Sequence, residues 1–229
     1  MIPEIKITHD LRHLFGPARD QGPRPTCLAF AASDTHAGTR PGWDPLSCEF
    51  AFWRAQQRGR RPPSSGATLG HMLDAIRLDG QPHEAGWPYL PATPVDVANW
   101  TPPAALGPIF GREGHEVVAS FATAQAHLAS GAPVMLLMML SPSFFTPAAG
   151  GLIVPAPGEA PQPAVRHAVI GVASGQVGGE ASILVRNSWG AGWGVDGHAW
   201  LTEAFVTPRL FALAILGGDV VAPLYSKAA

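Results

Sequence analysis

The sequence predicts an α+β fold whose N-terminal half is mainly helical and whose C-terminal half is mainly β-structure. Between residues 27 and 79, apolar residues recur at helical spacing in three segments. After residue 115, short apolar runs alternate with Gly- and Pro-rich turns, which is typical of strands. The Pro-rich stretch 91–108 shows neither pattern and separates the halves. The chain has 229 residues, 46% of them hydrophobic, which is enough for one domain or two joined lobes.

The N-terminal half begins with a short strand at residues 5–7. Three helices are then predicted, over residues 27–37, 46–57 and 71–79. Thr26 and Ser47 are candidate N-caps of the first two helices, because their hydroxyls can accept a hydrogen bond from a free backbone amide. Gly38 and Gly80 are predicted to end the first and third helices.

The C-terminal half is predicted to contain one helix and six strands. The helix covers residues 122–129, and the strands cover 115–121, 134–140, 167–173, 182–187, 197–201 and 210–215. The three methionines in the run 134–140 are interpreted as core residues, since a metal-binding methionine needs a polar setting. Residues 141–163 are predicted to form a Pro- and Gly-rich loop.

Composition excludes several classes of function. The net charge of −2 offers no polybasic face for nucleic acid or a membrane surface. The longest apolar run, 133–140, is too short to span a bilayer, and the N-terminus lacks the apolar core of a signal peptide. Two cysteines do not make a disulfide framework, so a reducing, cytoplasmic location is expected. His9 and His13 lack a third ligand, so no metal site is predicted.

Cys27 is the candidate nucleophile. It follows the Gly- and Pro-rich loop 20–26 and begins an apolar helical run, so it lies near a helix N-terminus. The helix dipole there favours a thiolate. A lone cysteine among apolar residues is more often a buried thiol, and that interpretation is favoured for Cys48, which has no base near it in the sequence.

Two further stretches, Val165–Val172 and Ile183–Gly194, change the interpretation of Cys27. With residues 20–32, they resemble the active-site segments of papain-like (clan CA, family C1) cysteine peptidases. The second stretch contains Asn187-Ser188-Trp189-Gly190 and a later Trp-Gly pair. His167 lies 140 residues after Cys27, within the family interval of about 130–150 residues, and Asn187 lies 20 residues after His167.

The resemblance implies a papain-like two-lobed fold, expected as a single catalytic domain over residues 1–229. The helical lobe would cover residues 11–105, and the β lobe 1–10 and 106–229. The implied activity is thiol-dependent cleavage of peptide bonds through a thioester intermediate. The expected partner is a peptide or protein substrate, with no cofactor, metal, nucleic acid or membrane, and any regulatory partner is unknown.

The resemblance also assigns the catalytic roles. Cys27 would attack the peptide carbonyl, and His167 would be its imidazolium partner and would protonate the leaving amine. The side-chain oxygen of Asn187 would fix the orientation of that ring, shielded from water by Trp189. Gln21 and the backbone amide of Cys27 would stabilise the oxyanion.

Substrate-binding residues are implied by the same likeness. They are Gly66, Ala67, Thr68, Leu69, Val165 and Trp189. Ala67 stands where the family has a glycine that pairs with the substrate backbone as an added strand. The next two residues and Val165 would line a mostly apolar pocket for the second substrate residue before the cut.

The chain departs from the family at several points. Arg24 replaces the upstream disulfide cysteine, and Leu28 replaces the tryptophan after the nucleophile. The missing disulfides resemble intracellular bacterial members, and only 26 residues precede Cys27, so no inhibitory pro-segment is expected. Arg166 before the His would favour the thiolate but disfavour the imidazolium, and the sequence leaves open which effect is larger.

Two other functions remain open at this level. An acyltransferase or peptide ligase would use the same residues with an amine in place of water, and product analysis with added amine separates the two. A catalytically silent module would retain only a peptide groove, and a thiol-reactivity assay discriminates against it.

Overall fold

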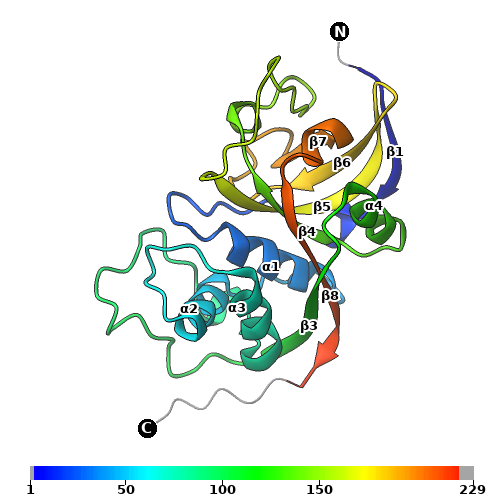
Figure 1. Cartoon of the computed structure of the whole chain (residues 1–229). Coiled ribbons are helices and arrows are strands. Elements are labelled where there is room, and N and C mark those ends of the chain that lie inside the picture. Colours follow the sequence, from blue (N-terminus) through cyan, green and yellow to red (C-terminus); the bar gives the residue numbers. More distant parts are fainter. Residues whose placement is uncertain (1–2, 222–229) are drawn as a thin grey trace. The chain divides into compact units, whose positions relative to one another are not determined.

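The computed structural model describes residues 3–221. The chain forms two compact units, shown as ribbons in Figure 1. The β unit comprises Met1–Asp20 and Glu116–Ile215, and the helical unit comprises Gln21–His115 and Leu216–Ala229. Helices and an antiparallel sheet are both present, which confirms the predicted α+β class.

The β unit is built around the long strand β5 (Arg166–Val177). On one side, β5 pairs with β6 (Glu180–Arg186), which pairs with β7 (His198–Thr202). On the other side, β4 (Val134–Met139) pairs with the first part of β5, and β1 (Ile5–Asp10) pairs with its last part. Strand β8 (Leu210–Val220) pairs with β4, and all these pairs are antiparallel.

A tight hairpin joins β5 to β6, in yellow in Figure 1. Its two connecting residues, Gly178 and Gly179, have φ angles of 59° and 87°. A two-residue hairpin loop matches the strand twist when both central residues have positive φ, which glycine adopts without a steric cost. This turn sets the register between the two strands that precede and follow it.

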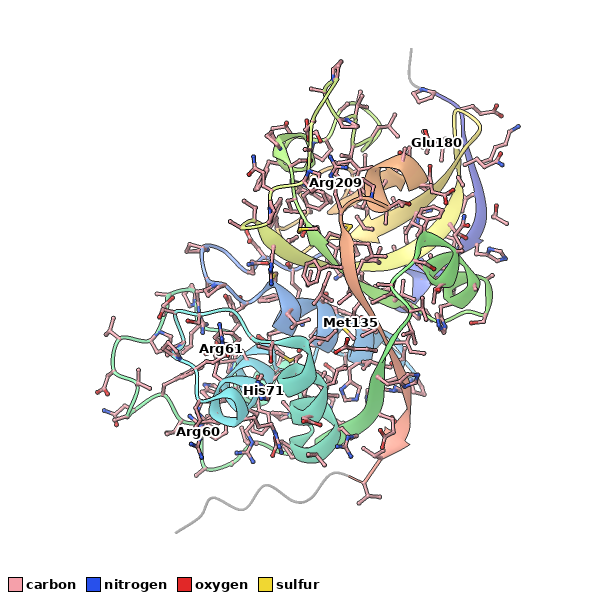
Figure 2. The ribbon with its side chains drawn as sticks, viewed as in Figure 1. Arg60, Arg61, His71, Met135, Glu180 and Arg209 are labelled. Atoms are coloured by element: carbon pink, nitrogen blue, oxygen red, sulfur yellow. The ribbon has the colours of Figure 1, made fainter. Side chains whose placement is uncertain are left out.

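The helices α4 (Phe121–Ala129) and α5 (Glu203–Val206) complete the β unit, together with two 3₁₀ turns, η1 (Arg12–Leu14) and η4 (Pro142–Phe145). Ser120 caps α4 by accepting a 3.0 Å hydrogen bond from the backbone amide of Thr123. The apolar face of α4 packs on residues from β4 to β8 in one core cluster. Met135 (labelled in Figure 2) and Met138 are fully buried, as expected of core residues.

The helical unit contains α1 (Cys27–Gly38), α2 (Cys48–Gly59) and α3 (Leu69–Asp74), which continues as the π-helical turn η2 (Ala75–Asp79). Strand β2 (Gln81–Pro82), the turn η3 (Glu84–Gly86) and β3 (Ile109–Val117) follow, and β2 pairs antiparallel with β3. Aromatic rings fill its core: Phe50, Trp53 and Trp87 lie with centroids 5.8–6.4 Å apart. Such pairs add to the apolar area that they bury.

The two predicted helix caps have different outcomes. Ser47 caps α2, because its hydroxyl accepts a 3.1 Å hydrogen bond from the amide of Phe50. The prediction that Thr26 caps α1 with its side chain is wrong. Its hydroxyl instead bonds the hydroxyl of Tyr89 at 2.8 Å, so a tertiary partner replaces the local backbone amide.

Several strand boundaries differ from the sequence-based ones. Strand β3 covers Ile109–Val117 instead of 115–121, and β8 extends to Val220 instead of residue 215. Strands β1 and β5 also continue, to Asp10 and Val177, beyond their predicted ends at residues 7 and 173. The parts that the predicted strands leave out, residues 109–114 and 216–220, contain charged residues and glycines, which are disfavoured in strands. The Arg112 side chain is nevertheless only 9% exposed, and its guanidinium donates to the carbonyl of Gly217 at 2.8 Å, which ties the two segments together.

Cys48, at the first turn of α2, is fully buried, in agreement with its interpretation as a packed thiol. Over residues 3–221, none of the helices is both long enough and apolar enough to cross a membrane.

Stability is expected to fall in acid because His36 on α1 is buried. Its Nδ1 lies 2.9 Å from the side-chain oxygen of Gln81, and burial lowers the pKa of His36 to about 4, against the opposing effect of that hydrogen bond. Between pH 6.5 and 4 the unfolded chain binds a proton at this site that the folded chain does not bind. As the pH is lowered through this window, the free energy of unfolding should therefore decrease, by up to about 3 kcal/mol from this residue.

Urea unfolding at pH 7.0, 5.5 and 4.5 measures this effect. The variant His36→Gln cannot titrate, so its stability should depend less steeply on pH than that of the wild type. A variant with the wild-type slope would show that His36 is not the source.

Candidate active site

His167 and Asn187 meet in the β unit through the hairpin. His167 is the second residue of β5, and Asn187 directly follows β6. The register pairs Ile170 with Arg186, which brings the start of one strand close to the end of the other. The ring nitrogen Nε2 of His167 lies 2.6 Å from Oδ1 of Asn187.

The orientation of the Asn187 amide is set by its neighbour. The backbone amide of Ser188 donates a 2.8 Å hydrogen bond to Oδ1 of Asn187, so that atom is an acceptor. It follows that Nε2 of His167 carries the proton in this hydrogen bond. In the neutral ring the other nitrogen, Nδ1, is then unprotonated and able to accept a proton.

Aromatic rings enclose this pair. The ring of Trp189 lies 4.6 Å from the His167 ring between centroids, and Phe144 lies 5.9 Å from it. Phe145, which is 48% exposed, stacks on Trp189 at 5.4 Å. Burial lowers the pKa of His167 to about 4, whereas the hydrogen bond to Asn187 opposes that shift. Within its own unit, the imidazole is therefore neutral at pH 7.

The Gly-rich turn after Asn187 has a specific backbone shape. Gly190 and Gly194 have φ angles of 72° and 62°. A side chain at Gly194 would collide with the carbonyl oxygen of His198, so this position requires glycine. Trp193 fixes the turn by donating from its indole nitrogen to the carbonyl of Phe144 at 3.1 Å.

Cys27 is the first residue of α1 in the helical unit, and it is partly exposed. A thiol at the first turn lies in the positive end of the helix dipole. Gln21 precedes it in the same loop and donates from its side-chain amide to the carbonyl of Arg24 at 2.8 Å. These two residues belong to one compact loop, as the sequence predicts.

Residues 66–69 of the helical unit, the substrate strip expected from the sequence, are partly extended and partly accessible. Thr68 has φ −90° and ψ 152°, and Ala67 is absent from the residues with positive φ, so its backbone can take a strand conformation. Within the described chain, the amide and carbonyl of Ala67 make no backbone hydrogen bond. The strip is held at its neighbour, because the guanidinium of Arg61 donates to the carbonyl of Gly66 at 3.0 Å.

Basic side chains lie beside this strip. Arg61 and His71 both approach Gly59 and lie near one another in Figure 2. The hydroxyl of Thr68 is 2.8 Å from Nδ1 of His71. Leu69 is buried at the start of α3, and Val165 lies half-buried just before β5 in the other unit.

The described contacts therefore join His167, Asn187 and Trp189 in the β unit, and Gln21 to the loop before Cys27 in the helical unit. The pairing of Cys27 with His167, and of Val165 with Thr68, remains a prediction. In residues 3–221, no group of three or more His, Cys, Asp or Glu side chains is arranged to hold a metal ion.

Sequence reasoning missed two sets of residues around these groups. The rings of Phe144 and Phe145 pack against His167 and Trp189, and they come from a Pro-rich loop with no periodic signal. Arg24, in the loop before α1, pairs with Glu49 in the first turn of α2. The only local signal for Arg24 was its place in the nucleophile loop, where the family has a cysteine.

Comparisons with known proteins find two sequence matches. Residues 111–206, which contain His167 and Asn187, match the family model "Papain family cysteine protease". A stretch of 40 residues is 48% identical to Papaya proteinase 4 from Carica papaya; it covers 18% of this chain and 12% of that protein.

Solved structures extend the likeness over almost the whole chain. Xylellain, a cysteine protease from Xylella fastidiosa, has a TM-score of 0.76 at 20% identity, covering 94% of this chain and 90% of its own. The bromelain protease from Ananas comosus has a TM-score of 0.67 at 19% identity, covering 90% of this chain and 96% of its own. The fold is therefore that of papain-like cysteine proteases, and the match over residues 111–206 shows that the likeness extends to the sequence of this part of the chain.

Proposed function

We propose that this protein hydrolyses peptide bonds with Cys27 as the nucleophile and His167 as its partner. The observation that carries the proposal is the 2.6 Å hydrogen bond between His167 and Asn187. It leaves Nδ1 of a buried imidazole as the proton acceptor. An isolated structural histidine needs no such orientation, whereas a general base and acid does.

The reaction begins when the proton of the Cys27 thiol passes to His167. The sulfur attacks the substrate carbonyl, and the oxyanion is stabilised by the side-chain amide of Gln21 and the backbone amide of Cys27. His167 then gives its proton to the leaving amine, the C–N bond breaks and a thioester remains. Water, deprotonated by the same imidazole, hydrolyses the thioester and restores the thiol.

The electrostatics of His167 fit a transient ion pair. Its pKa of about 4 reflects burial without a negative partner. A thiolate close to Nδ1 would favour the charged ring, as an opposite charge within about 4–6 Å does in general. The imidazolium thus depends on the thiolate, and both charges disappear together when the proton returns to sulfur.

Trp189 serves the same site in this proposal. Its ring lies over the His167 ring at 4.6 Å and excludes water from the hydrogen bond to Asn187. Phe145, stacked on Trp189 at 5.4 Å, is half-exposed and extends the apolar surface around that ring.

A peptide library tests the function directly. Incubation followed by mass spectrometry should reveal new peptide termini, and E64, the inhibitor in complex with the bromelain protease, is a suitable probe for blocking them. A parallel arm with added amine separates hydrolysis from acyl transfer, because transfer would give amine adducts in place of free carboxylates. An unreactive Cys27 with no new termini would favour the catalytically silent alternative.

The same library should also reveal which substrate residues the predicted pocket prefers. If Thr68, Leu69 and Val165 line it, Leu, Val or Phe should be enriched at the second position before the cut. One methylene is worth only about 1–3 kcal/mol, so a preference without strict exclusion is expected. A profile dominated by charged residues at that position would contradict the assignment of these three residues.

A further inference from the structure

The nucleophile loop, residues 21–27, is anchored by a buried ion pair. The guanidinium of Arg24 donates to both carboxylate oxygens of Glu49, with Nη1 to Oε2 at 2.6 Å and Nη2 to Oε1 at 3.0 Å. Both side chains are 0% exposed. Glu49 lies in the first turn of α2, so the pair ties the loop to a second helix.

Other groups of the helical unit complete this ion pair. Glu49 also accepts hydrogen bonds from the indole of Trp100 at 2.7 Å and from the backbone amide of Leu90 at 3.1 Å. Arg24 donates to the carbonyl of Leu90 at 2.6 Å, and its guanidinium lies 4.8 Å from the centre of the Tyr89 ring. The position of the guanidinium is thus fixed in three dimensions.

Stability alone does not account for this arrangement. Burying two charges is costly, and well-packed apolar residues in place of a buried ion pair are often as stable or more stable. The Nε atom of Arg24 is buried and has no hydrogen-bond partner within the described residues, which adds to the cost. The ion pair differs from apolar residues because its two parallel hydrogen bonds have a fixed direction and so fix the position of the loop.

Hydrogen bonds connect Arg24 and its neighbours to the groups assigned to catalysis. The carbonyl of Arg24 accepts the hydrogen bond from the side-chain amide of Gln21 at 2.8 Å. Tyr89, which packs under the Arg24 guanidinium, donates from its hydroxyl to the carbonyl of Gln21 at 2.7 Å, and the Thr26 hydroxyl bonds it at 2.8 Å. The loop is therefore held on both sides of Arg24, and Thr26 directly precedes Cys27.

We propose that Arg24 and Glu49 are positioning residues, which hold Gln21 and the backbone amide of Cys27 where the oxyanion develops. This inference rests on the function proposed above. The ion pair fixes the loop without a thiol, at the position where relatives have a disulfide cysteine. The geometry of the loop is then independent of reductant, while Cys27 itself needs a reduced state.

The double variant Arg24→Met, Glu49→Gln tests the proposal. It removes both charges together, and the single glutamine oxygen can still accept from one of the two groups, Trp100 or Leu90, that donate to different carboxylate oxygens in the wild type. Misplacing a catalytic group by about 1 Å can cost 10²-fold in rate, so kcat should fall by roughly 30- to 100-fold, with KM within about threefold of wild type. The rate of Cys27 alkylation by iodoacetamide should stay within about threefold, because alkylation forms no oxyanion.

The matched control is Asp79→Asn. It removes the charge of a carboxylate that pairs with two arginines of α2, Arg54 at 2.7 Å and Arg58 at 2.6 Å, without touching the nucleophile loop. Its kcat should equal that of wild type. Arg24→Lys, which keeps the charge but not the two parallel bonds, should lie between wild type and the double variant.

Tyr89→Phe provides a second readout if the double variant does not fold. It removes the hydroxyl that bonds Gln21 and Thr26 but keeps the ring, and kcat should fall by roughly tenfold, because two hydrogen bonds that hold the loop are lost. A folded double variant with wild-type kcat, or a Tyr89→Phe variant with unchanged kcat, would overturn the inference. Equal losses in kcat and in alkylation would also overturn it, since they would indicate general disruption.

The same assays separate this inference from the proposed function. A wild-type protein that alkylates at Cys27 but hydrolyses no peptide would contradict the proposed function, and the positioning role with it. An active wild type with an equally active double variant contradicts the positioning role alone.

Discussion

Replacing Cys27 with alanine should abolish peptide hydrolysis, with a fall in kcat of at least about 10⁴-fold. Loss of a nucleophile leaves only the catalysis that arises from binding and from oxyanion stabilisation. Since Cys27 is a partly exposed residue at the start of α1, the shorter side chain removes no core packing. The kcat for the best library peptide is the measurement, and the melting temperature reports folding.

Cys48→Ala is the matched control for this prediction. Cys48 is the first residue of α2, as Cys27 is of α1, but it is fully buried. The variant should retain kcat within about threefold, and its small cavity should lower the melting temperature by only a few degrees.

Limiting iodoacetamide near pH 6 should modify Cys27 before Cys48. Turnover in Cys27→Ala, or first labelling of Cys48, contradicts the assignment.

Much of the fold could be predicted because its signals are local. The apolar run 134–140 and the two runs on either side of the hairpin predict the existence of β4, β5 and β6, although the predicted end of β5 lies four residues before its end at Val177. Ser47 caps α2 because its partner is three residues away in the same chain segment. Where the partner of a polar residue is close in sequence, propensity and structure agree.

The errors arise where the partner is distant in sequence. The hydroxyl of Thr26 finds Tyr89, 63 residues away, instead of the backbone of its own helix. The strand prediction does not cover residues 109–114 of β3, and the guanidinium of Arg112 within them bonds the carbonyl of Gly217, 105 residues away. Local patterns carry no information about such pairs, since hydrogen bonding depends on which groups the tertiary fold brings together.

The same distinction applies to the candidate site. The identities of His167 and Asn187 could be predicted from short motifs, because the hairpin between them sets their distance. The groups that position the site could not, since Phe144 packs on His167 from a loop and Arg24 binds a carboxylate on α2. Motifs thus indicate the groups that are proposed to react, whereas the groups proposed to hold them in place require the tertiary contacts.

Replacing His167 with alanine should lower kcat by about 10²- to 10⁴-fold, the usual contribution of a general acid and base. The variant removes Nδ1 and the hydrogen bond to Asn187 together. It should also change the pH dependence of Cys27 alkylation. Without the imidazole, the thiol should react as an ordinary cysteine that ionises near pH 8.5. In wild type, alkylation should persist near pH 6, because proton transfer to His167 supplies thiolate there.

Alkylation rates between pH 5 and 10, with kcat in parallel, measure both effects. The control is His115→Ala, because His115 is an exposed histidine of β3 and its loss should change neither profile. If His167→Ala lost turnover but kept wild-type alkylation at pH 6, the imidazole would act only on the leaving group. In the proposed mechanism His167 takes the proton of the Cys27 thiol, so its loss must change both profiles. If both profiles were unchanged, His167 would not be the partner of Cys27.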